Sequence, residues 1–321
     1  MKTVVFTRFG PPEVLTVCET QTPSPRDDEV LVRIHATTVT AAEAAMRRGR
    51  PLWGRVVLGV VRPRKRMRTL GIELAGEIAA IGKHVSRFRV GDEVFGFAGF
   101  DIGANAEFLC LRETASLCLK PVNSTFEESA AAVDGASTAL FFLRDRAGVR
   151  PGHRVLVLGA SGSIGTYAVQ LARRLGAEVT GVCSTPNVAL VQSLGAHHVI
   201  DYTRQDFTQS SLTYDVVFDT VGKSSFFHCR SALAPSGCYV ATTGLANYVL
   251  GWATRVSGKR VVTGMSVDKS AALPYLRSLI ESDDLRVVID RQFDLDDIIE
   301  AHRYVDSGRK RGNVVVRVTT A

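Results

Sequence analysis

The strongest chemical signal in the sequence is the turn Gly159-Ala160-Ser161-Gly162-Ser163-Ile164-Gly165, which follows an apolar run and precedes an amphipathic stretch. A strand, a glycine turn and a helix in this order bind the pyrophosphate of a dinucleotide at the helix N-terminus. Gly162 would let the backbone approach the pyrophosphate, and Gly165 would permit close packing of helix on strand. Ala160 replaces the first glycine of the strict pattern. The predicted ligand-contacting residues are Ala160, Ser161, Gly162, Ser163, Ile164 and Gly165.

The residues at the end of the next apolar run determine whether NAD or NADP is the preferred cofactor. An NAD site needs an acid there for the ribose hydroxyls, but this run ends in Cys183-Ser184-Thr185. A carboxylate would repel the 2′-phosphate of NADP, whereas Ser184, Thr185 and Asn187 could donate hydrogen bonds to it. We therefore expect NADPH, with NADH as the alternative because the loop lacks Lys and Arg. Tyr202 and the basic turn Arg309–Arg311 could supply further contacts.

Metal and disulfide patterns are not found in the sequence. The six cysteines are scattered without a CxxC pair, and the seven histidines follow no ligand spacing. A disulfide scaffold or zinc knuckle is therefore not expected, and the cysteines should be free thiols.

The net charge of +7 is concentrated in one segment. Nine Lys or Arg and no acid lie between Glu43 and Glu73, so the rest of the chain sums to 7 − 9 = −2. Trp53, Val56, Val57, Leu58, Val60 and Val61 interleave with these charges. The segment 47–68 could be a solvated loop, a helical insert over the cofactor cleft, or a peripheral contact with a membrane interface. Nucleic acid is not expected as a partner, because no reader motif accompanies the patch.

The surrounding elements divide the 321 residues into two parts. The first 120 residues or so alternate short strand-like runs with glycine turns, which indicates a mainly β domain. From about Thr125 apolar strands alternate with helices, which indicates a parallel sheet covered on both faces. No apolar run is long enough to span a bilayer and the start lacks a signal core, so a cytoplasmic location is expected.

Three stretches carry a resemblance over essentially the whole chain: Gly71–Gly96, Gly103–Phe108, and the glycine turn continued to Leu194–Tyr202. The sequence resembles the zinc-independent quinone oxidoreductase (zeta-crystallin-like) branch of the medium-chain dehydrogenase/reductase superfamily. The resemblance implies a GroES-like, mainly β catalytic domain over 1–124 and 267–321. A doubly wound Rossmann domain over 125–266 would bind NADP, with the cofactor in the cleft between the domains. It also implies homodimers through the Rossmann sheet edge, around Arg260 to Ser266.

The resemblance further implies an activity: transfer of hydride from NADPH to a quinone or an α,β-unsaturated carbonyl, without zinc. Where zinc alcohol dehydrogenases carry their ligands, this chain reads Val39-Thr40-Ala41-Ala42 and Gly71-Ile72-Glu73. Thr40 stands where relatives present an Asn to the cleft, and Thr138 should approach the nicotinamide mononucleotide half. Val221 and Gly244 should end later strands of the sheet, where ligands bind. For Glu73 the resemblance implies a structural role near the domain junction.

Two readings of the sequence remain open. One is the enzyme just described. The other is a non-catalytic nucleotide-binding protein that senses redox state or contacts partners, including a membrane surface, through its basic segment. An intact glycine turn serves both. The identity of the acceptor, and whether one or two electrons move, are also open.

Overall fold

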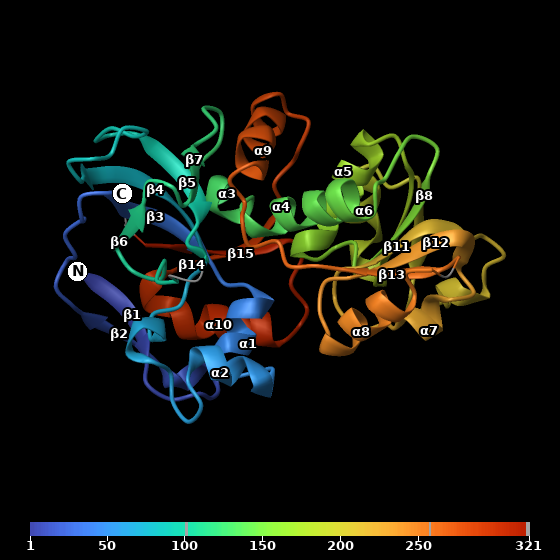
Figure 1. The fold of residues 1–321 in the computed structure, drawn as a ribbon, viewed down its shortest axis with the longest axis horizontal. Helices are drawn as coiled ribbons and strands as arrows, with labels where there is room; N and C mark the ends of the chain where they lie inside the picture. Colours follow the sequence, from blue (N-terminus) through green and yellow to red (C-terminus); the bar gives the residue numbers. More distant parts are fainter. Residues whose placement is uncertain (100–101, 257, 319–321) are drawn as a thin grey trace. The chain divides into compact units, whose positions relative to one another are not determined.

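The computed structural model describes residues 1–99, 102–256 and 258–318, apart from the Trp53 side chain. The chain forms two compact units: unit 1 comprises Met1–Asp134 and Asp268–Ala321, and unit 2 comprises Gly135–Val267 (Figure 1). The sequence placed the first boundary at 125, but helix α3 (Phe126–Ala131) packs against strands of unit 1. The second boundary differs by one residue, since we expected unit 1 to resume at 267.

Unit 1 is built on a seven-stranded, mostly antiparallel sheet with the order β14-β15-β3-β4-β5-β7, in which β6 also pairs with β3. A separate hairpin-like sheet pairs β1 with β2. Unit 1 is therefore built from two separate stretches of sequence, and the antiparallel pairing of β15 with β3 joins them into one sheet. The strands are β1 (Lys2–Phe6), β2 (Leu15–Glu19), β3 (Glu29–Thr38), β4 (Glu73–Ile81), β5 (Glu93–Phe97), β6 (Phe108–Arg112), β7 (Ser116–Leu119), β14 (Ile289–Asp294) and β15 (Asn313–Arg317).

Short helices cover this sheet and carry local start signals. Helix α3 begins with a capping box, in which Thr125 and Glu128 each accept the other's backbone N–H. The helices assigned wholly or partly to unit 1 are α1 (Ala41–Arg47), α2 (Arg55–Leu58), α3, α4 (Asp134–Leu140), α9 (Ala272–Glu281) and α10 (Ile298–Asp306).

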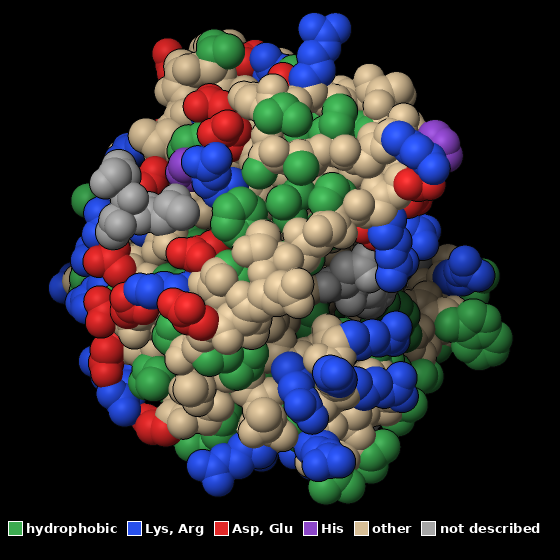
Figure 2. Space-filling model, turned by 90° about the vertical axis from the view of Figure 1, so that its left-hand side faces the viewer, with side chains coloured by type: hydrophobic (Ala, Val, Ile, Leu, Met, Phe, Trp, Pro, Cys, Tyr) green, Lys and Arg blue, Asp and Glu red, His purple; other side chains and the backbone are tan. Residues whose placement is uncertain are grey.

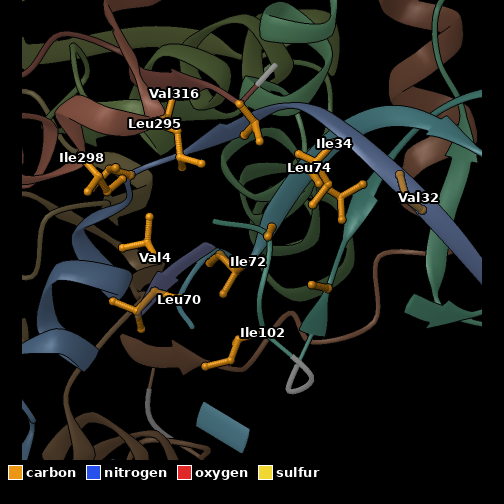
Figure 3. Packing of buried hydrophobic residues seen from close by; sticks show 14 of the residues in the cluster. Val4, Val32, Ile34, Leu70, Ile72, Leu74, Ile102, Leu295, Ile298 and Val316 are labelled. Carbon is orange, nitrogen blue, oxygen red and sulfur yellow. The ribbon is translucent and has the colours of Figure 1, made fainter. Parts of the chain in front are cut away.

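The core of unit 1 joins segments that are far apart in the chain. Figure 3 shows Val4, from the first strand, packed in the same cluster as Leu295, Ile298 and Val316 from the last fifty residues or so. Alternate residues of the strands point inward, so that Val32 and Ile34 of β3 are both fully buried. This packing holds the C-terminal tail to the N-terminal part.

Unit 2 is a six-stranded, wholly parallel sheet with the order β10-β9-β8-β11-β12-β13. The expected alternation of strands and helices is confirmed. Helix α5 begins at Ser163 and buries an apolar face that includes Tyr167, Ala168 and Leu171. The elements are β8 (Arg154–Leu158), α5 (Ser163–Arg174), β9 (Glu178–Cys183), α6 (Val188–Ser193), β10 (His198–Asp201), β11 (Tyr214–Asp219), α7 (Phe226–Cys229), β12 (Leu233–Ala241), α8 (Leu245–Ala253) and β13 (Arg260–Thr263).

Among the described residues, no helix has the length and apolar character that a membrane crossing requires.

Candidate nucleotide-binding site

The glycine turn is fixed to the sheet by backbone hydrogen bonds. The N–H groups of Gly159 and Ala160 both donate to the carbonyl oxygen of Val182 in β9, at 3.1 and 3.0 Å. Gly162 N–H donates to Gly159 O at 3.0 Å, which closes the turn. Ala160 is fully buried, so its side chain packs inside the unit and faces no ligand.

The two glycines singled out by the sequence have different surroundings. A Cβ on Gly165 would lie 2.1 Å from Gly159 O, so only glycine permits α5 to approach the turn this closely. A Cβ on Gly162 would meet nothing nearer than Gly159 O at 3.4 Å. Gly162 therefore presents open backbone directly before α5, whose first N–H groups lack acceptors within the helix. This cradle fits a pyrophosphate, held by Gly162 and the amides that follow it.

The loop after β9 is attached to the turn by Asn187. Its side-chain amide donates to Ser161 Oγ at 3.0 Å and to Ser184 Oγ at 3.2 Å. Three predicted contact residues therefore form one cluster of hydroxyl and amide groups. Such groups are neutral hydrogen-bond partners for a ribose or a phosphate.

Thr185 points instead to an acid that the sequence analysis missed. Its hydroxyl donates to Asp201 Oδ2 at 2.5 Å. Asp201 ends β10, in register with Cys183 of β9, so parallel pairing brings this carboxylate to the same sheet edge. The hydrogen bond from Thr185 is the main cause that lowers the pKa of Asp201, and bonds from Thr203 add to it. Tyr202, directly after the strand, is exposed.

A cation accompanies this acid. Arg204 Nε lies 3.5 Å from Asp201 Oδ2, and its side chain is 75% exposed. The loop after β9 has no basic residue of its own, but Arg204, in the loop after the neighbouring strand β10, lies beside it. The other basic turn considered for this role lies in unit 1, where Arg311 N–H donates to Asp290 Oδ2 at 2.7 Å.

The ends of two further strands complete this edge. Asp219, buried at the end of β11, accepts the N–H groups of Val221 at 3.0 Å and Gly222 at 2.8 Å. The loop is thereby turned back over the glycine turn, because a Cβ on Gly159 would lie 2.1 Å from Val221 Cγ2. Gly244 follows β12 with a φ of +97° and precedes α8. Val221 and Gly244 therefore lie at the carboxyl edge where open parallel sheets bind ligands.

Thr138 is positioned by the contact between α4 and α5. A Cβ on Gly135 would lie 2.7 Å from Ser163 Oγ, so the start of α4 touches the start of α5. Thr138, three residues later on the same helix face, is buried. Thr40, like the basic turn Arg309–Arg311, belongs to unit 1.

Thr40 caps a helix in unit 1. Its Oγ1 accepts the N–H of Glu43 at 3.0 Å, which stabilises the start of α1. The hydroxyl keeps its own proton for a further acceptor.

Glu73 is fully buried at the start of β4 and is bonded on both oxygens. Oε1 accepts Asp134 N–H at 2.5 Å, and Oε2 accepts the Thr38 hydroxyl. Desolvation, followed by the charge of Asp134, raises the pKa of the Glu73 carboxyl. Lys269 Nζ pairs with Asp134 Oδ1 at 2.8 Å. These contacts join β4 to the two places where the chain leaves and re-enters unit 1, in keeping with a structural role.

All six cysteines are free, three of them buried and three half-buried. Burial raises the pKa of Cys183 and Cys229 to about 11, so neither is a reactive thiolate at neutral pH. Within the described part of the chain, no three His, Cys, Asp or Glu side chains are grouped to hold a metal ion.

The chain combines a mainly antiparallel unit with a parallel sheet whose first strand leads through a glycine turn into a helix, and the second of these is a dinucleotide-binding fold. Residues 26–141 match the model of the alcohol dehydrogenase GroES-like domain, and residues 194–316 match the model of zinc-binding dehydrogenases. The chain is 30% identical to a 2-methylene-furan-3-one reductase of Solanum lycopersicum, over 98% of this chain and 79% of the relative.

Two bacterial proteins are similar over nearly their full lengths. A quinone oxidoreductase of Pseudomonas aeruginosa is 30% identical over 98% of this chain and 99% of its own. The solved structure of the quinone oxidoreductase from Coxiella burnetii is 30% identical, covers 99% of both chains and has a TM-score of 0.91. The chain belongs to the quinone oxidoreductase branch of the medium-chain dehydrogenase/reductase superfamily. It is an NAD(P)H-dependent oxidoreductase.

Proposed function

We propose that this chain transfers hydride from NADPH to a quinone or an α,β-unsaturated carbonyl, without zinc. The observation that carries the choice of cofactor is the cluster around Asn187, where neutral hydroxyl and amide groups stand at the end of β9. Arg204 provides a positive charge beside it, while a nearby carboxylate, that of Asp201, accepts hydrogen bonds from Thr185 and Thr203. This arrangement favours a 2′-phosphate over a free 2′-hydroxyl.

The roles of the chain's own residues follow from their positions. Gly162 and the first amides of α5 would hold the pyrophosphate, and Ser161, Ser184 and Asn187 would hold the ribose phosphate. Val221, Gly244 and Thr138 would border the nicotinamide half, and the Thr40 hydroxyl would position the acceptor. When bound, the reduced nicotinamide would supply the hydride. A quinone or enone delocalises the charge that develops, so no metal ligand set is required of the protein.

A steady-state assay tests this proposal. NADPH and NADH oxidation are measured with quinones, 2-alkenals and cyclic enones, with zinc quantified in the same protein preparation. We expect turnover with NADPH, a higher KM for NADH, and no stoichiometric zinc. Turnover that needs added zinc, or that prefers NADH, would contradict the corresponding part of the proposal.

A charge substitution locates the phosphate. Asn187→Asp places a carboxylate in the cluster and should raise the KM for NADPH about tenfold or more, while leaving the KM for NADH nearly unchanged. Gln209→Glu, an exposed substitution of the same charge in the same unit, is the matched control. Equal effects of both variants on the KM for NADPH would show that the 2′-phosphate does not bind at this loop.

We also propose that the chain forms a homodimer through β13. This strand is the last in the order of its sheet, and α8 beside it exposes Leu245, Val249 and Trp252. An unpaired strand edge with apolar neighbours favours pairing with a second copy. Sedimentation of Trp252→Glu against the wild type tests this, and the variant should shift to the monomer.

A further inference from the structure

The segment Arg48–Arg68 of unit 1, here called the basic platform, is folded and attached to the core. It contains the short helix α2 and 3₁₀ turns at Leu52–Gly54 and Lys65–Met67. Leu58 and Met67 are 6% and 5% exposed and belong to the core cluster of unit 1. These two buried side chains attach the platform to the core of unit 1.

The aliphatic side chains of Leu52, Val56, Val57, Val60 and Val61 do not join that core. Val61 is 85% exposed, and Leu52, Val56 and Val60 are each exposed by about two thirds or more, at 70, 67 and 69%. Val57 is 49% exposed. A single exposed aliphatic residue is ordinary, but five within ten positions of the chain form a patch that marks an interaction surface.

The charges of the platform are not equivalent. Arg47, just before it, is fully buried and pairs with Asp306, as does Arg48. Arg55 lies over the Phe9 ring, 4.8 Å from its centre, and donates to Gly49 O. Arg50, Arg62, Lys65 and Arg66 are exposed, and across the described residues no ion pair engages them. Four cations thus remain available beside the apolar patch.

This combination selects the partner. Aliphatic side chains flanked by exposed cations match a lipid bilayer with anionic headgroups, where the apolar groups enter the acyl boundary and the cations meet phosphates. A nucleic-acid interface is polar and would leave the valines without an apolar environment. Figure 2 shows a face of the molecule on which Lys and Arg gather toward the lower edge, with hydrophobic side chains beside them.

We propose that the basic platform binds the surface of an anionic membrane. The contact is peripheral and inserts only the side chains of Leu52, Val56, Val57, Val60 and Val61. It does not depend on the reaction proposed above, and the test below does not use turnover.

Vesicle co-sedimentation of the full chain tests the proposal. Vesicles of phosphatidylcholine with phosphatidylglycerol are compared with phosphatidylcholine alone, at low and at physiological salt. We expect binding to the anionic vesicles only, weakened by salt. The triple variant Arg62→Gln, Lys65→Gln, Arg66→Gln should lose about fivefold in partition coefficient for each charge removed. The matched control Arg26→Gln, Arg89→Gln, Arg230→Gln removes the same charge from exposed positions elsewhere and should bind nearly as the wild type.

A second variant separates insertion from charge. Val60→Ser, Val61→Ser keeps every cation and should lose the binding that persists at physiological salt. Circular dichroism melting verifies that each variant is folded. Because the substituted side chains are exposed, we expect no loss of stability. Wild-type protein that stays in solution with anionic vesicles would overturn the proposal. An equal loss of vesicle binding in the charge-control variant would also overturn it. So would binding of the protein to a DNA duplex, if that binding depends on the platform cations and the protein does not bind vesicles.

Discussion

At the scale of single residues, the contacts of Glu73 show how a carboxyl can be kept in the interior. Both oxygens accept hydrogen bonds, from Asp134 N–H and from the Thr38 hydroxyl, while burial disfavours the charged form. The carboxyl therefore holds its proton to higher pH in the folded chain than in the unfolded chain. Its ordinary pKa is 4.5.

This raised pKa gives a pH dependence of stability with a definite sign. The folded chain binds more protons than the unfolded chain above the ordinary pKa, so the contribution of Glu73 is fully present below it and is lost as pH rises through the folded pKa. The free energy of unfolding should fall by up to about 1.4 kcal/mol per pH unit in that window. Glu73→Gln, which is neutral and keeps a carbonyl for Asp134 N–H, should flatten the slope. Urea unfolding of both proteins from pH 5 to 9 measures it, and parallel profiles would refute the assignment.

Two glycines of the turn make a matched pair of substitutions. Gly162→Ala puts a methyl group into open space and should leave stability within about 0.5 kcal/mol, while it weakens NADPH binding about tenfold or more. Gly165→Ala forces α5 away from Gly159 O, 2.1 Å from the new Cβ, and should cost about 2 kcal/mol of stability or more. Thermal unfolding and NADPH titration of both variants are required. Similar stability losses in the two would show that Gly162 is constrained by packing and not by a ligand.

At the scale of elements, register between neighbouring strands decides what reaches the site. Asp201 lies beside Cys183 because β10 and β9 pair in parallel, and this places Arg204 by the loop after β9. The sequence around Cys183 contains neither residue. A prediction made from the end of β9 alone therefore could not include Asp201 and Arg204. The available signal was that two neighbouring parallel strands end at the same edge of a sheet.

This element-level contact leads to a test of Arg204. Arg204→Gln should raise the KM for NADPH about threefold to tenfold and leave the KM for NADH unchanged, because an exposed cation contributes modestly. Steady-state kinetics with both cofactors measures the difference. Arg230→Gln, exposed on the same unit, serves as control. A loss shared by NADH would mean that Arg204 stabilises the loop and does not contact phosphate.

The start of α3 offers a second element-level test. Thr125→Ala removes the side-chain acceptor for Glu128 N–H and should cost about 1 kcal/mol of stability. Thr125→Ser, which keeps the acceptor, should restore most of it, as urea unfolding would reveal. No difference between the two variants would mean that the cap contributes nothing.

Much of the fold was accessible from periodicity and punctuation. The strands of unit 2, the glycine turn and the start of α5 all follow from local patterns, because a parallel strand is apolar throughout and a turn needs glycine. Contacts distant in sequence were not accessible. Arg47 looked like part of a solvated patch, yet it is buried against Asp306, 259 positions later. The helix at 126–131 similarly looked like the start of the second domain until its packing was known.

At the scale of the whole molecule, one unit is continuous in sequence and the other is not. Unit 2 contains its complete sheet within 135–267, whereas the sheet of unit 1 takes β14 and β15 from the C-terminal part. The fragment 135–267 should therefore fold alone, and the fragment 1–134 should not. Circular dichroism and cooperative urea unfolding of both fragments would check this. A cooperatively folded 1–134 would mean that β15 is dispensable to the sheet.

The place of β15 between β14 and β3 also bears on synthesis. β3 is translated early and β6 pairs with its Glu29–Arg33 part, but β15, which pairs with Ala36–Thr38, is translated only after unit 2. The nucleotide-binding unit, begun later, is fully translated sooner and is free to fold first. During that interval Ala36–Thr38 of β3 lack the strand that satisfies their backbone groups, so the nascent first domain is exposed to aggregation through this part of its edge.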